Sequence, residues 1–380
     1  APAPRQGQGS SGVTRGYQSI GLVTRPWDPY LTLGMYALVP YGSFTTGHSF
    51  FVDEREQFFT NSLHPELYGD RLTAVSLAFG AATRIGETLS LGVSFTLGLV
   101  NEAQATSYVG NSVDVPGTLQ LSNRIDVLAS VAPHFAASWR AMEDLELSLV
   151  VHTPQEMVID TQFGSYLPSG SLDVAQRTAT HGWLPWTPAV GGRWGVWKGG
   201  GHSLALVGNL RYAGWSAYVN RQSERPHSDY PWTDTFPGSV GLRHRFEGGL
   251  QSGVDLQYAP TPVPPQTGRS NYVDNDRMAV AASVSRDFPT RWNNTFRVSL
   301  SAQLHHLFER YQRKFDPRDG ALVDGYYPQI VVDEWPDSAT DASGNRFDEA
   351  QGLQTNNPGW PGFSSGGMLF GAGFNVALLY

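Results

Sequence analysis

Eight basic side chains occur on the polar faces of strand-like stretches, and they are the residues best placed to do chemistry. A guanidinium or imidazolium group binds a carboxylate through charge-assisted hydrogen bonds. Because residues at every second position of a strand share one face, we expect these groups to point into an enclosed space. There they could neutralise the acidic end of a ligand. The candidates are Arg124, His134, Arg193, Arg211, Arg243, Arg245, Arg297 and His305.

The same residues also have a structural interpretation. Asp126, Glu146 and Asp255 stand on the polar faces of the same stretches. Pairing with these carboxylates would fill the interior with an ion-pair network and leave nothing for a ligand. For any single basic residue this structural role is the more common one, so both interpretations stay open.

Other chemistry has little support in the sequence. The chain contains no cysteine, which removes disulfides and thiolate catalysis. His305 and His306 are adjacent, so a strand would point them to opposite faces rather than toward one metal ion. The adjacent His-Ser pairs at 48–49 and 202–203 are equally unsuited to act as base and nucleophile. We therefore expect no enzyme activity, no metal and no cofactor, and the net charge of −8 argues against a nucleic-acid partner.

The stretches that position these residues alternate with a period of two. From Met368 to Tyr380 every second residue is apolar or aromatic, and most residues between are small or polar. In a soluble protein such a stretch would be a half-buried edge strand. In an outer-membrane barrel the apolar face would contact lipid, and the final aromatic residue would lie at the interface. The stretch from Phe296 to Leu304 alternates in the same way, with Arg297 on its polar face.

Composition favours the barrel. Only 16% of the 380 residues are charged and 12% are aromatic. Residues 88–101 form the longest uncharged strand-like run, and this run is too short for a membrane helix, which needs about 20 apolar residues. Low charge without long apolar runs is typical of strands that alternate between lipid and lumen.

Connections alternate between short turns and longer loops. Short turns at 84–87, 141–144, 198–201, 247–249 and 289–294 join paired strand-like stretches, whereas two of the longer connections span residues 40–70 and 314–362. Among the paired stretches we expect single strands at 119–140, 145–161 and 174–197. Short periplasmic turns and long extracellular loops are typical of membrane barrels. The sequence thus predicts an all-β, transmembrane antiparallel β-barrel of about 14 strands over residues 17–380, preceded by a flexible segment at 1–16.

Thirteen strands are found in these residues, whereas bacterial single-chain barrels have an even number. A strand that would close against the stretch from Ser365 to Tyr380 has no candidate. Either residues 1–16 take that place, a separate chain supplies the strand, or the natural polypeptide is longer at its N-terminus. We expect the last.

Several motifs resemble the FadL family of outer-membrane transporters, which also includes OMPP1 and TodX. The stretch from Leu38 to Ser43 (LVPYGS) is similar to that family's third strand entering its second extracellular loop. The hairpin from Trp139 to Thr161, the segment from Tyr258 to Pro264 (YAPTPVP) with the following residues 274–277 (DNDR), and Ser365 to Gly367 occur in the expected order.

The resemblance implies a fourteen-stranded barrel with an N-terminal hatch in its lumen and a lateral opening where the third strand is kinked. No counterpart of the hatch, of its Asn-Pro-Ala motif or of the first strand occurs in these residues. The implied function is uptake of hydrophobic molecules, such as long-chain fatty acids or aromatic hydrocarbons, by passive diffusion with lateral exit. We expect capture by an aromatic loop containing Phe50, Phe51, Phe58 and Phe59, or by the loop at 314–362.

The resemblance places the chain in the Gram-negative outer membrane, in contact with lipid and lipopolysaccharide. The rival hypothesis is a structural barrel that binds another envelope protein and has lost transport. A general porin for polar solutes is a third, weaker interpretation, because the lumen faces carry many small and apolar residues.

Overall fold

The structure is a computed structural model that describes residues 16–28, 30–40, 76–98, 101–109, 119–127, 130–166, 172–219, 225–226, 231–266, 272–290, 294–313 and 362–379. The four phenylalanines of the expected capture loop lie outside the described residues. So do residues 41–70 and 314–361 of the two long loops, and residues 1–15 of the N-terminal segment.

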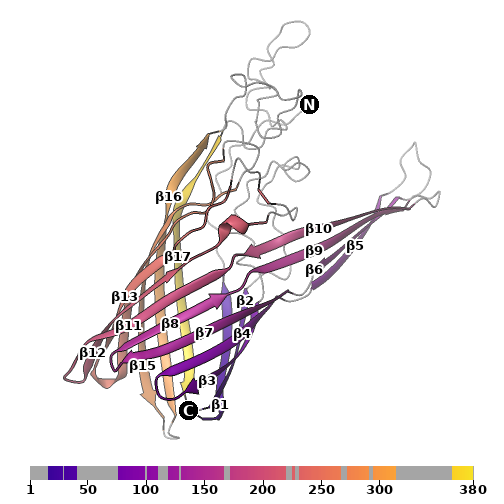
Figure 1. Cartoon of the computed structure of the whole chain (residues 1–380). Helices are drawn as coiled ribbons and strands as arrows, with labels where there is room; N and C mark the ends of the chain where they lie inside the picture. Colours follow the sequence, from indigo (N-terminus) through magenta and orange to yellow (C-terminus); the bar gives the residue numbers. More distant parts are fainter. Residues whose placement is uncertain are drawn as a thin grey trace.

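Thirteen antiparallel strands form one large sheet in the described part of the chain, as the sequence predicts. The sheet curves into a barrel (Figure 1). In order of hydrogen-bonded neighbours, the strands are β1 (Tyr17–Trp27), β2 (Leu31–Pro40), β3 (Ser76–Ile85), β4 (Leu89–Gly98), β7 (Ser130–Met142), β8 (Leu145–His152), β11 (Thr187–Gly199), β12 (His202–Arg211), β13 (Gly238–Arg245), β14 (Leu250–Ala259), β15 (Arg277–Pro289), β16 (Thr295–Arg313) and β17 (Gly362–Leu379). The all-β barrel is confirmed, and β1 and β17 stand at the two ends of the hydrogen-bonded order.

Short connections gather at one end of the barrel. Turns of a few residues join β3 to β4, β7 to β8, β11 to β12, β13 to β14 and β15 to β16. At the β11–β12 turn, Gly200 and Gly201 both have positive φ (59° and 79°), a conformation that glycine adopts without the steric cost of a side chain. Because short turns face the periplasm in barrels of this type, we call this the periplasmic end and the opposite one the extracellular end.

A second sheet, which the sequence pattern does not predict, projects from the extracellular end (Figure 1). Its four strands are β5 (Asn101–Val109), β6 (Leu119–Val127), β9 (Gln155–Tyr166) and β10 (Leu172–Leu184), hydrogen-bonded in the order β10-β9-β6-β5. In the chain they continue β4, β7, β8 and β11, four neighbouring strands of the barrel wall.

The expected single strands at 119–140, 145–161 and 174–197 are therefore each two strands, and those expectations were wrong. Proline explains two of the breaks. Pro154 separates β8 from β9, and Pro185 separates β10 from β11; proline has no N–H to donate to a neighbouring strand.

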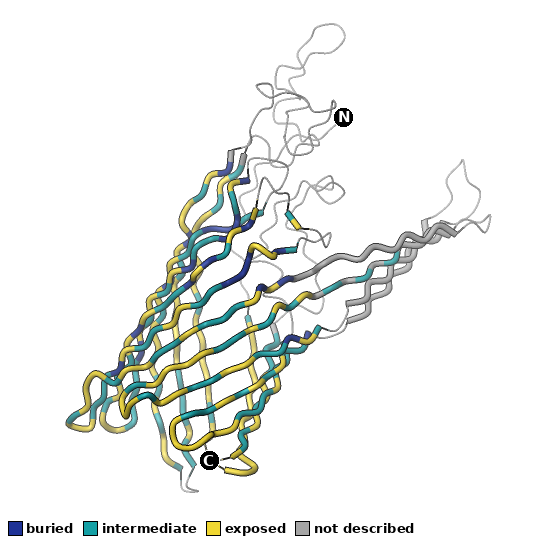
Figure 2. The backbone as a smooth tube through the Cα atoms, viewed as in Figure 1, coloured by how far each residue is buried: buried dark blue, intermediate teal, exposed yellow. Residues whose placement is uncertain are grey.

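Residue pairing assigns one face of each barrel strand to lipid. Leu206, Leu242 and Val254 are directly opposed across β12, β13 and β14, and all three are exposed. Exposed residues run along the barrel strands, while most buried residues gather toward the extracellular end (Figure 2). An apolar outer surface and a core confined to one end are what a lipid-spanning barrel requires. Within the described residues, no helix is long and apolar enough to cross a membrane.

The strand register predicts unequal effects of arginine on the two faces. Leu242 lies on the apolar face midway along the wall, in the hydrogen-bonded row that continues through Val254, Ala282 and Ala302. Leu242→Arg should destabilise the folded barrel by about 2–4 kcal/mol, because it places a charge in hydrocarbon. Gln303→Arg, one residue along β16 and on the lumen face, should cost far less. Urea-driven unfolding in lipid vesicles measures both, and equal losses would mean that the register is shifted by one residue.

Candidate functional site: the lumen and its extracellular rim

Carboxylates neutralise two of the predicted basic residues in the periplasmic half of the lumen. Arg243 donates to Asp255 across 2.8 Å. Arg297 binds Asp287 with two bonds, Nε to Oδ1 at 2.5 Å and Nη2 to Oδ2 at 2.8 Å. Two parallel bonds between these planar groups fix the geometry as well as the charge. For Arg243 and Arg297 the structural interpretation therefore describes the observed contacts.

Missing side chains make room for the Arg243–Asp255 pair. A methyl group at Gly241 would collide with the Asp255 carboxylate, and one at Gly253 would press on Arg243. Glycine is therefore needed at both positions by the close approach of the ion pair, although neither has a positive φ.

The extracellular half of the lumen is different. His134 on β7, His152 on β8, Arg211 on β12, Arg277 on β15 and His305 on β16 follow one another around the inner wall, and we call these five residues the basic belt. Strand pairing places His134 opposite His152, and it places His305 opposite Ala279, two residues along β15 from Arg277. Successive members from His134 to His305 lie close enough to interact electrostatically.

Polar contacts within the belt connect its members to each other and to a hydroxyl group. The two Nδ1 atoms of His134 and His152 are 3.0 Å apart, and His134 Nε2 is 2.7 Å from Thr96 Oγ1. Nδ1 of His305 is buried and has no hydrogen-bond partner among the described residues. Nor do Arg211, His134, His152 and His305 have a carboxylate partner within that part of the chain. A level of the lumen where the Arg211 guanidinium has no paired acid among the described residues favours an anionic group there.

The other predicted site residues fall into different places. Arg193 on β11 is paired in register with Glu146, and Arg245 lies near the periplasmic end of β13. Arg124 is on β6, in the projecting sheet. It is not on the barrel wall, so its expected lumen position was wrong. The stretch 119–140 consists of two strands, and Arg124 lies on the one that belongs to the projecting sheet. Within the described residues, no three His, Asp or Glu side chains converge as a metal site would require.

Sequence reasoning missed His152 and Arg277. Both continue the polar face of their strands: His152 follows the alternation of β8, and Arg277 is the first residue of β15. Period-two alternation extended to the strand ends would have found both residues. The alternation could not show that His152 lies beside His134, or that Arg277 lies near Arg211, because these residues come from different strands.

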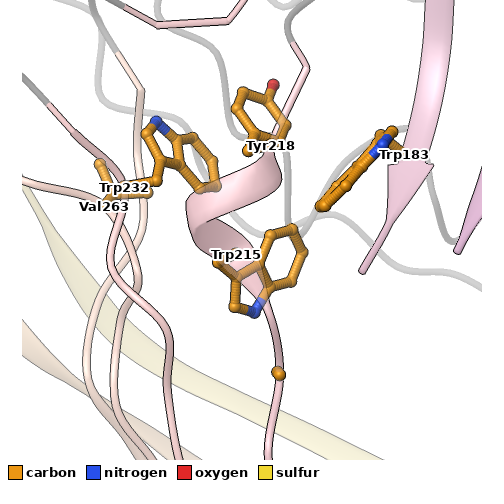
Figure 3. Close-up of a cluster of buried hydrophobic side chains, with 6 residues drawn as sticks. Trp183, Trp215, Tyr218, Trp232 and Val263 are labelled. Atoms are coloured by element: carbon orange, nitrogen blue, oxygen red, sulfur yellow. The ribbon is translucent and has the colours of Figure 1, made fainter. Parts of the chain in front are cut away.

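Aromatic residues form the main buried cluster above the belt (Figure 3), and we call it the aromatic cap. Tyr218 and Trp232 stack with ring centroids 3.7 Å apart and an interplanar angle of 12°. Trp215, in the short 3-10 helix η2 (Trp215–Ala217), lies 5.7 Å from Trp232. Trp183, near the end of β10, Ala213 and Val263 complete the cluster. The cap therefore joins the base of the projecting sheet to the connections that follow β12 and β14.

The buried side chain of Asn275 hydrogen-bonds the connection between β14 and β15 to the barrel wall. The Asn275 amide nitrogen donates to the carbonyl oxygens of Phe308 (2.8 Å) and Ser365 (2.9 Å), which belong to β16 and β17. This is where the β16–β17 register shifts between Leu307 and Arg310. One amide thus satisfies carbonyl groups that the interrupted ladder would leave without partners.

The Asp234 carboxylate accepts hydrogen bonds at η2. The Tyr212 hydroxyl donates to Asp234 (2.6 Å), and so does the backbone N–H of Ser216 (2.8 Å). Burial acts to raise the pKa of Asp234, but these hydrogen bonds outweigh that effect and lower the pKa. Hydrogen bonding to Asp234 likewise raises the pKa of Tyr212. Because the folded-state pKa of Asp234 is depressed, its stabilising effect is present above the usual Asp pKa and is lost as pH falls through the lowered value.

Comparison with solved structures identifies the architecture. The crystal structure of a Pseudomonas aeruginosa FadL homologue matches with a TM-score of 0.54 and 13% identity, over 96% of this chain and 77% of that chain. The chain has a FadL-type fold. The CymD monoaromatic hydrocarbon channel matches with a TM-score of 0.45 and 13% identity, over 78% of this chain and 81% of that chain. The P. putida toluene transporter TodX gives 0.44 and 13%, over 78% and 77%.

No sequence-family model matches the chain, and no curated protein does either. At 13% identity the likeness to the P. aeruginosa structure concerns the fold. Within this FadL-type fold, the described lumen has two levels: an ion-paired level near the periplasmic end and the basic belt under the aromatic cap.

The cap predicts a local loss of stability. Trp232 is 3% exposed, so Trp232→Ala should cost about 3–5 kcal/mol in the cap and leave the barrel wall folded. Hydrogen exchange should then rise in residues 212–219 and stay unchanged in β13 and β14. Trp186→Ala, a nearby tryptophan that is 43% exposed, is the matched control. Equal effects of the two substitutions would contradict the role of the cap.

Proposed function

We propose that this chain is an outer-membrane channel for hydrophobic small molecules, and that those with an acidic end, such as long-chain fatty acids, place it at the basic belt. Movement is passive, and exit sideways through the wall is part of the proposal. The setting is a Gram-negative outer membrane. The FadL-type fold supports transport of this kind, and the belt is the observation that carries the ligand assignment.

The contrast between the two lumen levels supports the belt as the ligand-binding level. Arg243 and Arg297 each already have a carboxylate, so a ligand would have to displace that carboxylate. Arg211 has no such partner among the described residues, and it lies between His152 and Arg277 in the belt. A carboxylate held there would gain charge-assisted hydrogen bonds worth about 1.5–3 kcal/mol each.

Matched ligands test the assignment. A saturated sixteen-carbon fatty acid and the alcohol of equal length differ only in the head group. We expect the purified protein to bind the acid more tightly, and Arg211→Gln with Arg277→Gln to remove that preference, a loss of about tenfold or more. Arg84→Gln, a lumen arginine near the periplasmic end of β3, should keep it. Equilibrium binding is measured after circular dichroism confirms that each variant is folded.

Two results would contradict parts of this account. Equal binding of acid and alcohol by the unmodified protein would remove the acidic ligand and leave a hydrocarbon channel. No binding of either, and no uptake by cells that produce the protein, would contradict transport.

The projecting sheet favours a second candidate, a barrel that binds another envelope protein. β5 and β10 are its edge strands, and each pairs on one side only. An unpaired edge is a template for a strand from another chain. Uptake by the unmodified protein supports the channel. An unmodified protein that shows no uptake but captures an envelope protein, and loses that capture when residues 101–127 and 155–184 are replaced by short linkers, supports the partner-binding barrel.

A further inference from the structure

The lipid-facing wall from β12 to β15 is apolar except at one end. Along each strand, the residues that face lipid alternate with those that face the lumen. The lipid-facing rows, which run across neighbouring strands, include exposed Leu206, Leu242, Val254 and Val280. Three basic side chains stand on these rows: His202, His244 and Arg286. No carboxylate stands on the lipid-facing rows of these four strands, which the structure describes throughout. The wall therefore carries basic groups without acidic ones.

All three basic residues lie at the periplasmic end. His202 is the first residue of β12, and His244 is next to the last of β13. Arg286 is three residues from the end of β15. In a membrane barrel this level is the interface between acyl chains and head groups.

Aromatic rings surround the two histidines. The His202 ring lies 5.6 Å from His244 and 5.8 Å from Phe246, and the His244 and Phe246 rings are 3.9 Å apart. Exposed Trp197 lies 6.4 Å from His202. Aromatic rings of this kind collect at the membrane–water interface, where one side is apolar and the other wet.

Arg286 is exposed between apolar neighbours. Strand pairing places it between Leu250 and Val298. Its guanidinium lies over the Phe288 ring, 5.4 Å from the centroid. An arginine on the lipid face costs about 2–4 kcal/mol at mid-membrane and about 0–1 kcal/mol near the interface. Pairing with an anion would offset the remaining cost, and the anion present at that level of a membrane is the lipid phosphate.

We propose that His202, His244 and Arg286, with Trp197, Phe246 and Phe288, form a surface on which anionic phospholipids of the periplasmic leaflet place their phosphate head groups. Arg286 supplies a charge at any pH, and the histidines supply N–H donors whether neutral or protonated. The rings hold the glycerol and upper acyl region. This surface is on the outside of the wall and is independent of any cargo in the lumen.

Lipid binding to the purified full chain in neutral detergent tests the proposal. Native mass spectrometry at a series of concentrations would count bound phosphatidylglycerol and, separately, phosphatidylcholine with the same acyl chains. We expect preferential binding of phosphatidylglycerol. The double variant His244→Gln, Arg286→Gln should weaken that binding about tenfold or more. Arg84→Gln is the matched control, since Arg84 is a basic residue at the same end that faces the lumen.

The outcomes separate clearly. Equal binding of the two lipids by the unmodified protein would overturn the proposal, and so would a double variant that is folded and binds phosphatidylglycerol like the unmodified protein. Inorganic phosphate added at constant ionic strength should not displace the lipid. Displacement would show that a free phosphate ion, and not a phospholipid, is the ligand.

Discussion

Backbone hydrogen bonding inside hydrocarbon is the constraint on which the rest of this structure depends. No water is available there, so each buried N–H and C=O group must be paired with a neighbouring strand. Between neighbouring strands from β1 to β17, the thirteen-stranded sheet meets that demand through antiparallel pairing, with register shifts in four of the strand pairs. Once pairing is fixed, side chains alternate strictly between lipid and lumen. The positions of the belt, the ion pairs and the phospholipid-binding surface all follow from that alternation, because a shift of one residue would exchange the two faces.

Charge divides the lumen into two levels with different consequences. Near the periplasmic end, Arg243 and Arg297 are neutralised by Asp255 and Asp287, so these contacts stabilise the wall and attract little else. Toward the extracellular end, the basic belt faces the lumen beneath the buried aromatic cap. A hydrophobic molecule with an acidic end would meet the belt first and the neutralised level afterwards. The order of the two levels therefore suits entry from outside followed by release.

Much of the fold could be predicted from the sequence, and the site only in part. Period-two alternation and short turns are local signals, and they predicted the barrel, its thirteen strands and the polar faces that hold His134, Arg211 and His305. The projecting sheet was missed because β8 and β9 read as one alternating stretch, and only Pro154 marks the break. The cap was missed because Trp183, Trp215 and Trp232 meet through tertiary contacts between separate connections. Which arginines are neutralised likewise depends on partners from other strands, as Arg297 and Asp287 illustrate.

Depth-dependent quenching along a single strand tests the alternation of faces most directly. The chain has no cysteine, so single cysteines at positions 239, 240, 242 and 243 can each carry a small fluorophore in vesicles that contain lipids with a quencher in the acyl chain. The account predicts strong quenching at 240 and 242 and weak quenching at 239 and 243. Uniform quenching along β13, or the opposite alternation, would contradict the assignment of lipid and lumen faces on which both the basic belt and the phospholipid-binding surface depend.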